Sequence, residues 1–291
     1  MDSGTAYLIG MILGNGEVQR MSDNTTFTID IPYKNIRTDD DRDVQVYVKA
    51  SLIDIRSIID PILGTDPLLV TSGRNSTKLS FTGTNSREYV REINDYIGSG
   101  TRQQNMKMTD KVFSLSADHR KSLLRGLADV TAYIRKSNIA FGQENQYRVY
   151  IEVPQNWQML IDIANLLKSV DVPVQTIDFA HPNFRDSQRK KYDEGKPDFW
   201  KKEHQIKVWA NEFLPIGFNI QHKQEALERY AEALLTAMDP EITHKYYWEK
   251  PVRRKKRPNH PGEDDPFILE KVRGKHYDSW TDLARDLGYH E

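Results

Sequence analysis

Two short apolar segments of the chain end in polar side chains that could hold a metal ion. The first, AYLIGMILGNGE, places Asn15 and Glu17 at its end, and the second, LLRGLADVTA, carries Asp129 and Thr131. Divalent metals such as Mg²⁺ prefer carboxylate oxygens, whereas Asn15 offers one neutral carbonyl oxygen and the Thr131 hydroxyl is poorer still. Two residues along a helix turn a side chain by about 200°, so we expect Asp129 to point away from the seam between the two segments. The direction of Glu17, which follows a glycine, stays open.

Glycines set the shape expected for both segments. Gly10 and Gly14 lie four residues apart, so they fall on one face of a helix and leave that face without side chains. A second helix can then pack with its backbone unusually close. Gly126 stands at the matching place of the second segment. We therefore predict that the two helices cross near these glycines, in preference to two unrelated core helices.

The ends of these helices are also predicted from local signals. The first helix, 5–15, is expected to stop at Asn15-Gly16, because glycine adopts the left-handed conformation of many C-caps. The second, 116–130, should begin with a capping serine. The flanking segments VYVKASLIDIRSI and VYIEVPQNWQMLI also match in pattern. Because these pairs recur in one order, we predict an internal duplication.

The segments AYLIGMILGNG and LLRGLADVTA resemble the two motif helices of single-chain LAGLIDADG homing endonucleases, and the resemblance covers residues 5–237. It implies two halves of helix, two strands, helix, two strands and helix. It also implies motif helices packed at a pseudo-twofold axis and two sheets that form a saddle over the DNA major groove. In that family an acidic residue at the end of each motif helix binds the divalent metals. Those positions fall here on Asn15 and Thr131, and Ala132 replaces the glycine after the second.

The neutral residues at both acid positions leave three explanations open. The protein is a DNA binder that has lost nuclease activity; or Asn15 is an engineered replacement of Asp, which would not explain Thr131; or Glu17, Asp129 or a strand residue supplies the ligands in a rearranged site. Mg²⁺ is the expected cofactor if the chain is catalytic, and otherwise none is expected. As an enzyme, it would be a divalent-metal-dependent DNA endonuclease of restriction or homing type.

The pattern and the resemblance together predict an α+β fold of two pseudo-symmetric αββαββα halves with saddle-shaped antiparallel sheets and a C-terminal extension. The expected domains are a first half (1–98), a linker (99–115), a second half (116–238) and a basic, aromatic extension (239–291). Strands are expected at 25–33, 44–49, 68–73, 78–82, 133–141, 147–153, 172–179 and 205–210. Further helices are expected at 52–63, 86–97, 157–168 and 224–237.

If the saddle exists, the outward residues of its strands are the candidates for reading DNA bases, because Arg and Lys suit guanine, Gln suits adenine and Glu accepts from cytosine. The ordinary solvated strand face is the alternative for each. The candidates are Thr26, Thr28, Gln45, Tyr47, Lys49, Lys78, Ser80, Arg135, Arg148, Tyr150, Glu152, Gln175 and Lys207. The basic run Arg253, Arg254, Lys255, Lys256 and Arg257 is the candidate for phosphate contacts.

Composition narrows the class of protein. The 291 residues are 38% hydrophobic and 29% charged, with a net charge of −1, which is low for a DNA-binding protein unless charge is locally clustered. The absence of cysteine excludes disulfides and thiolate metal sites. No apolar run reaches the roughly 18 residues of a membrane span, and no leader is evident, so a cytoplasmic protein without membrane contact is expected.

These observations predict a monomer that binds double-stranded DNA sequence-specifically. A non-catalytic DNA-binding regulator is the alternative to an endonuclease, and the two differ at Asn15 and Thr131. A protein-interaction scaffold would also fit the balanced charge, but its affinity for DNA would show no salt dependence.

Overall fold

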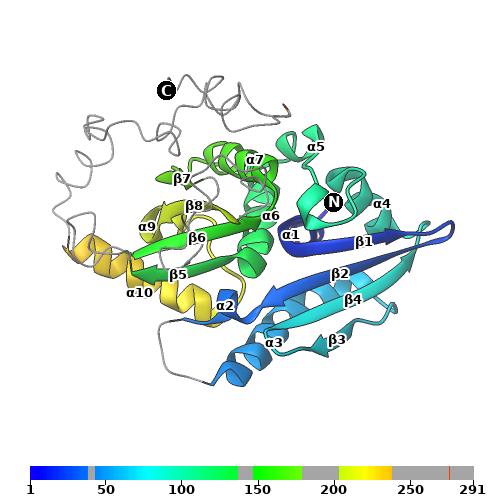
Figure 1. The fold of residues 1–291 in the computed structure, drawn as a ribbon, viewed down its shortest axis with the longest axis horizontal. Coiled ribbons are helices and arrows are strands. Elements are labelled where there is room, and N and C mark those ends of the chain that lie inside the picture. The colour runs from blue at the N-terminus through cyan, green and yellow to red at the C-terminus, as the bar shows by residue number, and fades with distance from the viewer. Residues whose placement is uncertain (39–42, 137–146, 179–202, 238–274, 276–291) are drawn as a thin grey trace, which may run out of the picture.

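The computed structural model describes residues 1–38, 43–136, 147–178, 203–237 and Lys275 (Figure 1). Within these residues, no helix is both long and apolar enough to cross a bilayer. The predicted extension, 239–291, lies outside the described residues apart from Lys275, and so does its basic run 253–257.

Two four-stranded antiparallel sheets with the same strand order confirm the predicted α+β class. The first has the order β1-β2-β4-β3, formed by β1 (Gly16–Arg20), β2 (Asn24–Pro32), β4 (Ser76–Thr84) and β3 (Leu69–Ser72). The second has the order β5-β6-β8-β7, formed by β5 (Ala132–Lys136), β6 (Tyr147–Pro154), β8 (Glu203–Trp209) and β7 (Thr176–Asp178). Figure 1 shows the two sheets side by side, with α1 and α6 near the middle of the molecule.

Helices cover the apolar faces of these sheets. The longer ones are α1 (Ser3–Asn15), α3 (Val44–Leu63), α4 (Glu88–Ile97), α6 (Ala117–Thr131), α7 (Trp157–Lys168) and α10 (Gln221–Ala237). Short ones are α2 (Tyr33–Ile36), η1 (Gln103–Asn105), α5 (Asp110–Phe113) and α9 (Ala210–Phe213). The expected linker is therefore partly helical, and it buries Met106 and Met108 in the core.

Helices α1 and α6 pack closely because of the glycines at their crossing, as the sequence predicts. A Cβ added to Gly10 would run into the backbone oxygen of Leu123, and one added to Gly126 would run into that of Tyr7. A Cβ on Gly14 would lie 2.9 Å from Cγ2 of Thr131. The two backbones therefore touch, and only glycine allows that approach.

The predicted left-handed cap at Gly16 is wrong. Helix α1 does end at Asn15, but Gly16 is extended, with φ −103° and ψ 159°, and already belongs to β1. Space explains this glycine instead, because a Cβ there would clash with the carbonyl oxygen of Ile12. The strand β1 follows the helix without a loop, and the sequence patterns did not reveal it.

The predicted strand at 44–49 is also wrong, because these residues form the first turns of α3. Asp43 caps this helix by accepting a hydrogen bond from the Gln45 backbone N–H at 2.7 Å. Tyr47 and Ser51, four residues apart, are both buried. A short alternating run does not distinguish a strand from a helix, and here the cap and the longer apolar period decide for the helix.

Candidate functional site

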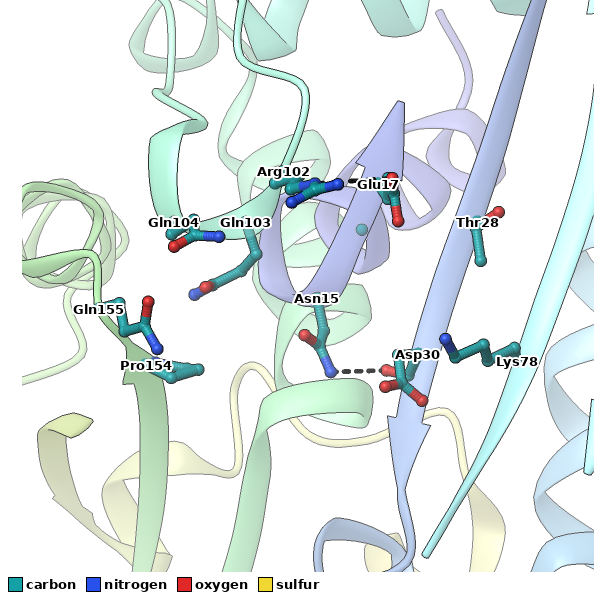
Figure 2. A pocket seen from close by; sticks show the side chains of 11 residues that line it. Asn15, Glu17, Thr28, Asp30, Lys78, Arg102, Gln103, Gln104, Pro154 and Gln155 are labelled. Carbon is teal, nitrogen blue, oxygen red and sulfur yellow. Dashed lines mark hydrogen bonds and ion pairs between the residues drawn. The ribbon is translucent and has the colours of Figure 1, made fainter. Parts of the chain in front are cut away.

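Asn15 stands at the mouth of a pocket at the end of α1. Its Nδ2 donates a hydrogen bond of 2.8 Å to the backbone oxygen of Asp30 on β2, which leaves Oδ1 turned away from that bond (Figure 2). The pocket has a volume of about 230 Å³. It is lined by Asn15, Gly16, Glu17, Thr28, Asp30, Lys78, Arg102, Gln103, Gln104, Pro154 and Gln155, so both halves and the linker contribute to it.

Thr131, at the corresponding end of α6, faces no such space. It is buried, and its hydroxyl donates a hydrogen bond of 2.7 Å to the Leu127 carbonyl of its own helix. A threonine inside a helix commonly satisfies its hydroxyl in this way. The two acid positions of the resemblance therefore hold two neutral side chains in different surroundings.

Glu17 lies on β1 and lines the pocket with Asn15. Its carboxylate lies 3.6 Å from Nε of Arg102 in the linker, and the two residues also form an isolated β-bridge. Both side chains are partly exposed, so this ion pair is a weak one. Glu17 thus reaches the pocket, although an arginine already faces its charge.

Asp129 is completely buried and does not line the pocket, but it does not point away from the helix seam as expected, because its carboxylate contacts Tyr7 of α1. Its carboxylate accepts hydrogen bonds from the Tyr7 hydroxyl at 2.7 Å and from the Asn219 backbone N–H at 3.1 Å. Burial raises the pKa of Asp129, which the nearby Lys223 ammonium opposes. Asp129 therefore holds the helix pair together, and its position gives it no route to the helix-end pocket.

Lys223, on α10, is a buried group that the sequence patterns did not single out. Its Nζ donates to the carbonyls of Ala128, Asp129 and Ala132 at 3.0, 3.1 and 2.8 Å. In its protonated form, Lys223 thus caps the C-terminal end of α6, where the helix dipole is negative. Burial lowers the pKa of Lys223 to about 7, although the negative charge of Asp129 acts to raise it.

The donor set does not fit the metal centre that the resemblance implies. Asn15 and Thr131 replace both carboxylates, and Asp129 is enclosed elsewhere. In the described part of the chain, no group of three or more His, Cys, Asp or Glu side chains comes together as a metal site would require. The pocket contains only Glu17 and Asp30 as carboxylates, and Lys78 and Arg102 balance their charge.

The outer face of the first sheet carries the candidates expected on its strands. Thr28 on β2 lies opposite Ser80 on β4, with their hydroxyl oxygens 3.2 Å apart. Thr26 pairs in the same way with Thr82 at 2.8 Å. Lys78 lies on this face beside Asp30 in the strand register. A short ladder of hydroxyl groups and one lysine is therefore presented on this surface.

The matching face of the second sheet is closed. Arg148 and Tyr150 are each only 3% exposed, and Glu152 and Lys207 are also buried. The Arg148 guanidinium lies over the Trp209 ring, with its Cζ 4.2 Å from the centroid. These four side chains were expected on an open surface that reads DNA, and their burial shows that this expectation is wrong. Among this sheet's candidates, Arg135 alone is exposed, and its Cζ lies 4.5 Å from the Tyr150 ring centroid.

Glu152 shows why this face is closed. In the strand registers it takes the place that Asp30 has in the first sheet, because Ile151 pairs with Ala132 as Ile29 pairs with Gly16. Its carboxylate accepts from the Tyr133 hydroxyl at 2.8 Å and from Gln205 at 3.0 Å, and it pairs with Lys34 at 2.5 Å. Tyr133 and Gln205 thus take the register positions that Glu17 and Lys78, which line the pocket, have in the first sheet.

Four further candidates do not share these faces. Gln45, Tyr47 and Lys49 lie on α3, where Tyr47 is buried, so they are not strand residues of the saddle. Gln175 precedes β7, and the register of β7 with β8 puts it on the side of buried Ile177. The pocket is lined instead by Arg102, Gln103 and Gln104 of the linker. The polar run TRQQN could have indicated these residues, but it was interpreted only as part of a connection between the halves.

Comparisons with known proteins find similar folds at low sequence identity. No protein-family model matches the chain, and no curated protein matches it by sequence. Mesophilic variants of the homing endonuclease I-DmoI are 12% identical over 76% of this chain and 95% of theirs, with a TM-score of 0.38. An I-DmoI variant in complex with its target DNA and in the presence of Mn is 12% identical over 77% and 98%, with a TM-score of 0.40. A double mutant of I-SmaMI is 10% identical over 83% and 92%, with a TM-score of 0.38. At these values the likeness assigns no activity, ligand or partner to this chain.

Proposed function

We propose that this protein binds double-stranded DNA sequence-specifically and does not cleave it. The observation that carries the proposal is the chemistry of the two helix ends. Asn15 and Thr131 are neutral, and each donates its hydrogen bond to a backbone carbonyl. Cleavage with divalent metals requires carboxylates that converge beside the scissile phosphate, and these two residues supply none.

Binding itself is supported by the surface that the first sheet presents. Hydroxyl groups of Thr26, Thr28 and Ser80 can donate to or accept from base edges, and Lys78 adds a positive charge beside them. Thr28 and Lys78 belong both to this face and to the lining of the helix-end pocket, so the face and the pocket are continuous. Duplex DNA offers the edges and phosphates that such a surface can contact.

The test is a selection from random duplexes followed by a cleavage assay. We expect the full chain to enrich a defined sequence, with an affinity that falls steeply as salt rises. A supercoiled plasmid that carries the selected site should stay intact with Mg²⁺ or Mn²⁺. If the chain enriches no sequence, or binds without salt dependence, the protein is not a specific DNA binder and the scaffold hypothesis takes its place.

An endonuclease is the second candidate, favoured by the two carboxylates, Glu17 and Asp30, that line the pocket beside Asn15. Efficient double-strand cutting by the unmodified chain would establish it and reject the proposal of a non-cleaving binder. Loss of that cutting in Glu17→Gln or Asp30→Asn, with DNA affinity retained, would identify the responsible group. Cutting that appears only in Asn15→Asp would instead identify a silenced nuclease, and with Thr131 unchanged we expect at most nicking.

A further inference from the structure

Amide side chains gather in the helix-end pocket from three separate parts of the chain. Asn15 ends α1, Gln103 and Gln104 belong to η1 in the linker, and Gln155 follows β6 in the second half. Figure 2 shows the Gln103 side chain pointing into the space between Asn15 and Pro154. The pocket therefore lies where the two halves and the linker meet, and its polar lining comes from all three.

Two polar atoms in this pocket have no partner. Gln103 is 9% exposed, and its buried Nε2 donates no hydrogen bond to any group that the structure describes. Oδ1 of Asp30 is likewise buried and accepts none. The backbone of Gln103 is fixed, because its carbonyl oxygen accepts a hydrogen bond of 2.6 Å from the Asn156 side chain. Buried polar groups in native proteins are almost always paired, so an unpaired donor and an unpaired acceptor in the lining of one pocket indicate a ligand.

The charge of the pocket limits what that ligand can be. Glu17 and Asp30 are opposed by Lys78 and Arg102, so the formal charge of the lining is balanced. A bare phosphate would meet two carboxylates, and a metal ion would meet two cations and few acidic ligands. A neutral group that carries a donor directly beside an acceptor satisfies both unpaired atoms. The edge of a purine base is such a group.

We infer that this pocket reads one purine edge of the bound duplex, an inference that rests on the proposed DNA-binding function. Gln103 donates from Nε2 to a ring nitrogen, while Oδ1 of Asp30 or Asn15 accepts from the neighbouring exocyclic amine. Adenine presents this pair as N7 and N6 in the major groove, and guanine presents N3 and N2 in the minor groove. The site adjoins the outer face of the first sheet, because Asp30 belongs to β2, but its donor comes from the linker and its second acceptor, Asn15, from a helix end.

The variant that tests the inference is Gln103→Met, which removes the amide and keeps the length of the side chain. We expect the selected sequence to lose its purine preference at one position, by about 5- to 150-fold, with the other positions unchanged. Thermal stability should stay equal or rise, because the variant removes an unpaired buried amide; a purely structural glutamine would instead lose stability. Gln45→Met, at an exposed glutamine on α3, is the matched control and should leave the preference intact.

Modified bases at the affected position distinguish the two purine edges. Replacing adenine by 7-deazaadenine removes the major-groove acceptor N7, and replacing guanine by 3-deazaguanine removes the minor-groove acceptor N3, so each removes the atom to which Gln103 would donate. One of these replacements should weaken binding of the unmodified protein and leave binding of Gln103→Met unchanged. If Gln103→Met keeps every base preference while salt-dependent binding persists, the purine-edge inference is wrong and the proposed function stands. If the unmodified protein selects no duplex, the proposed function fails first.

Discussion

The amide of Asn15 has a structural role besides leaving the helix end uncharged. It donates to the Asp30 backbone oxygen, so α1 is tied to β2 at the point where the helix ends. A carboxylate in the same place would set two acceptor oxygens against each other. The chemistry at the helix end and the attachment of the first sheet therefore depend on one side chain.

We predict that Asn15→Asp lowers the free energy of unfolding by about 1–2 kcal/mol at pH 7, because the variant loses a donor and gains a charge beside a carbonyl. Denaturation at pH 7 and at pH 4 measures this loss, which should shrink at pH 4 as the new carboxyl gains a proton and can donate. Asn15→Ala is the control, with a loss that does not change between these pH values. Equal stability of Asn15→Asp and the parent at pH 7 would contradict the role of this hydrogen bond.

The buried Lys223 makes a prediction about pH. Its pKa is lowered to about 7 by burial, from an ordinary value of 10.5. Between these values the unfolded chain holds a proton that the folded chain lacks, so stability should rise with pH by up to about 1.4 kcal/mol per unit. Urea denaturation from pH 7 to 10 measures the slope.

The double variant Asp129→Asn/Lys223→Met is the control for this slope, because it leaves no lone buried charge. The raised pKa of the Met1 amine, which donates to Glu92, acts in the opposite sense in both proteins and cancels in the difference. Identical slopes for the parent and the double variant would show that Lys223 keeps its proton throughout.

Among the helices, the pair α1 and α6 depends on the absence of side chains at its crossing. We predict that Gly10→Ala lowers the free energy of unfolding by about 1–3 kcal/mol or more, because its Cβ meets the Leu123 backbone, which cannot turn aside. Gly4→Ala in the same helix is the matched control. Its Cβ would lie 3.2 Å from the flexible end of Ile62, so we expect little loss in thermal denaturation. Equal melting temperatures of the two variants would contradict the backbone contact.

Across the molecule, the two sheets share one strand order, but their equivalent faces differ: one is exposed and the other is buried. The first keeps a hydroxyl-rich outer face and an open pocket, whereas the second buries Arg148 and Glu152 in contacts with Trp209, Tyr133 and Lys34. Any contact with DNA by the described residues is therefore expected to be unequal between the halves.

This asymmetry predicts different effects for two basic residues. Arg148→Ala should lower stability by about 1–3 kcal/mol, because the variant removes a buried guanidinium packed on Trp209. Lys78→Ala should leave stability within about 0.5 kcal/mol and reduce the salt dependence of DNA binding by about one counterion. Thermal denaturation and binding at several salt concentrations separate the two. A change of base preference in Arg148→Ala without loss of stability would restore it as a base reader.

The sequence by itself determined the features that depend on near neighbours along the chain. Gly10 and Gly126 identified the helix crossing, and Ser116 identified the N-cap of α6. Asn15 and Thr131 identified the neutral helix ends. Helical spacing and residue chemistry are local properties, so the sequence shows them. The strand at 16–20 and the helix at 44–49 were missed, because short alternating runs are ambiguous until a cap or a partner strand decides them.

Only the tertiary structure decided which polar groups are accessible. Asn15, Gln103 and Gln155 are far apart in the sequence, and they meet because the halves and the linker pack together. In the second sheet, alternation correctly put Arg148 and Glu152 on one face, but their burial depends on Trp209 and on Lys34 from the other half. Exposure is set by neighbours distant in the chain, and no local pattern records them.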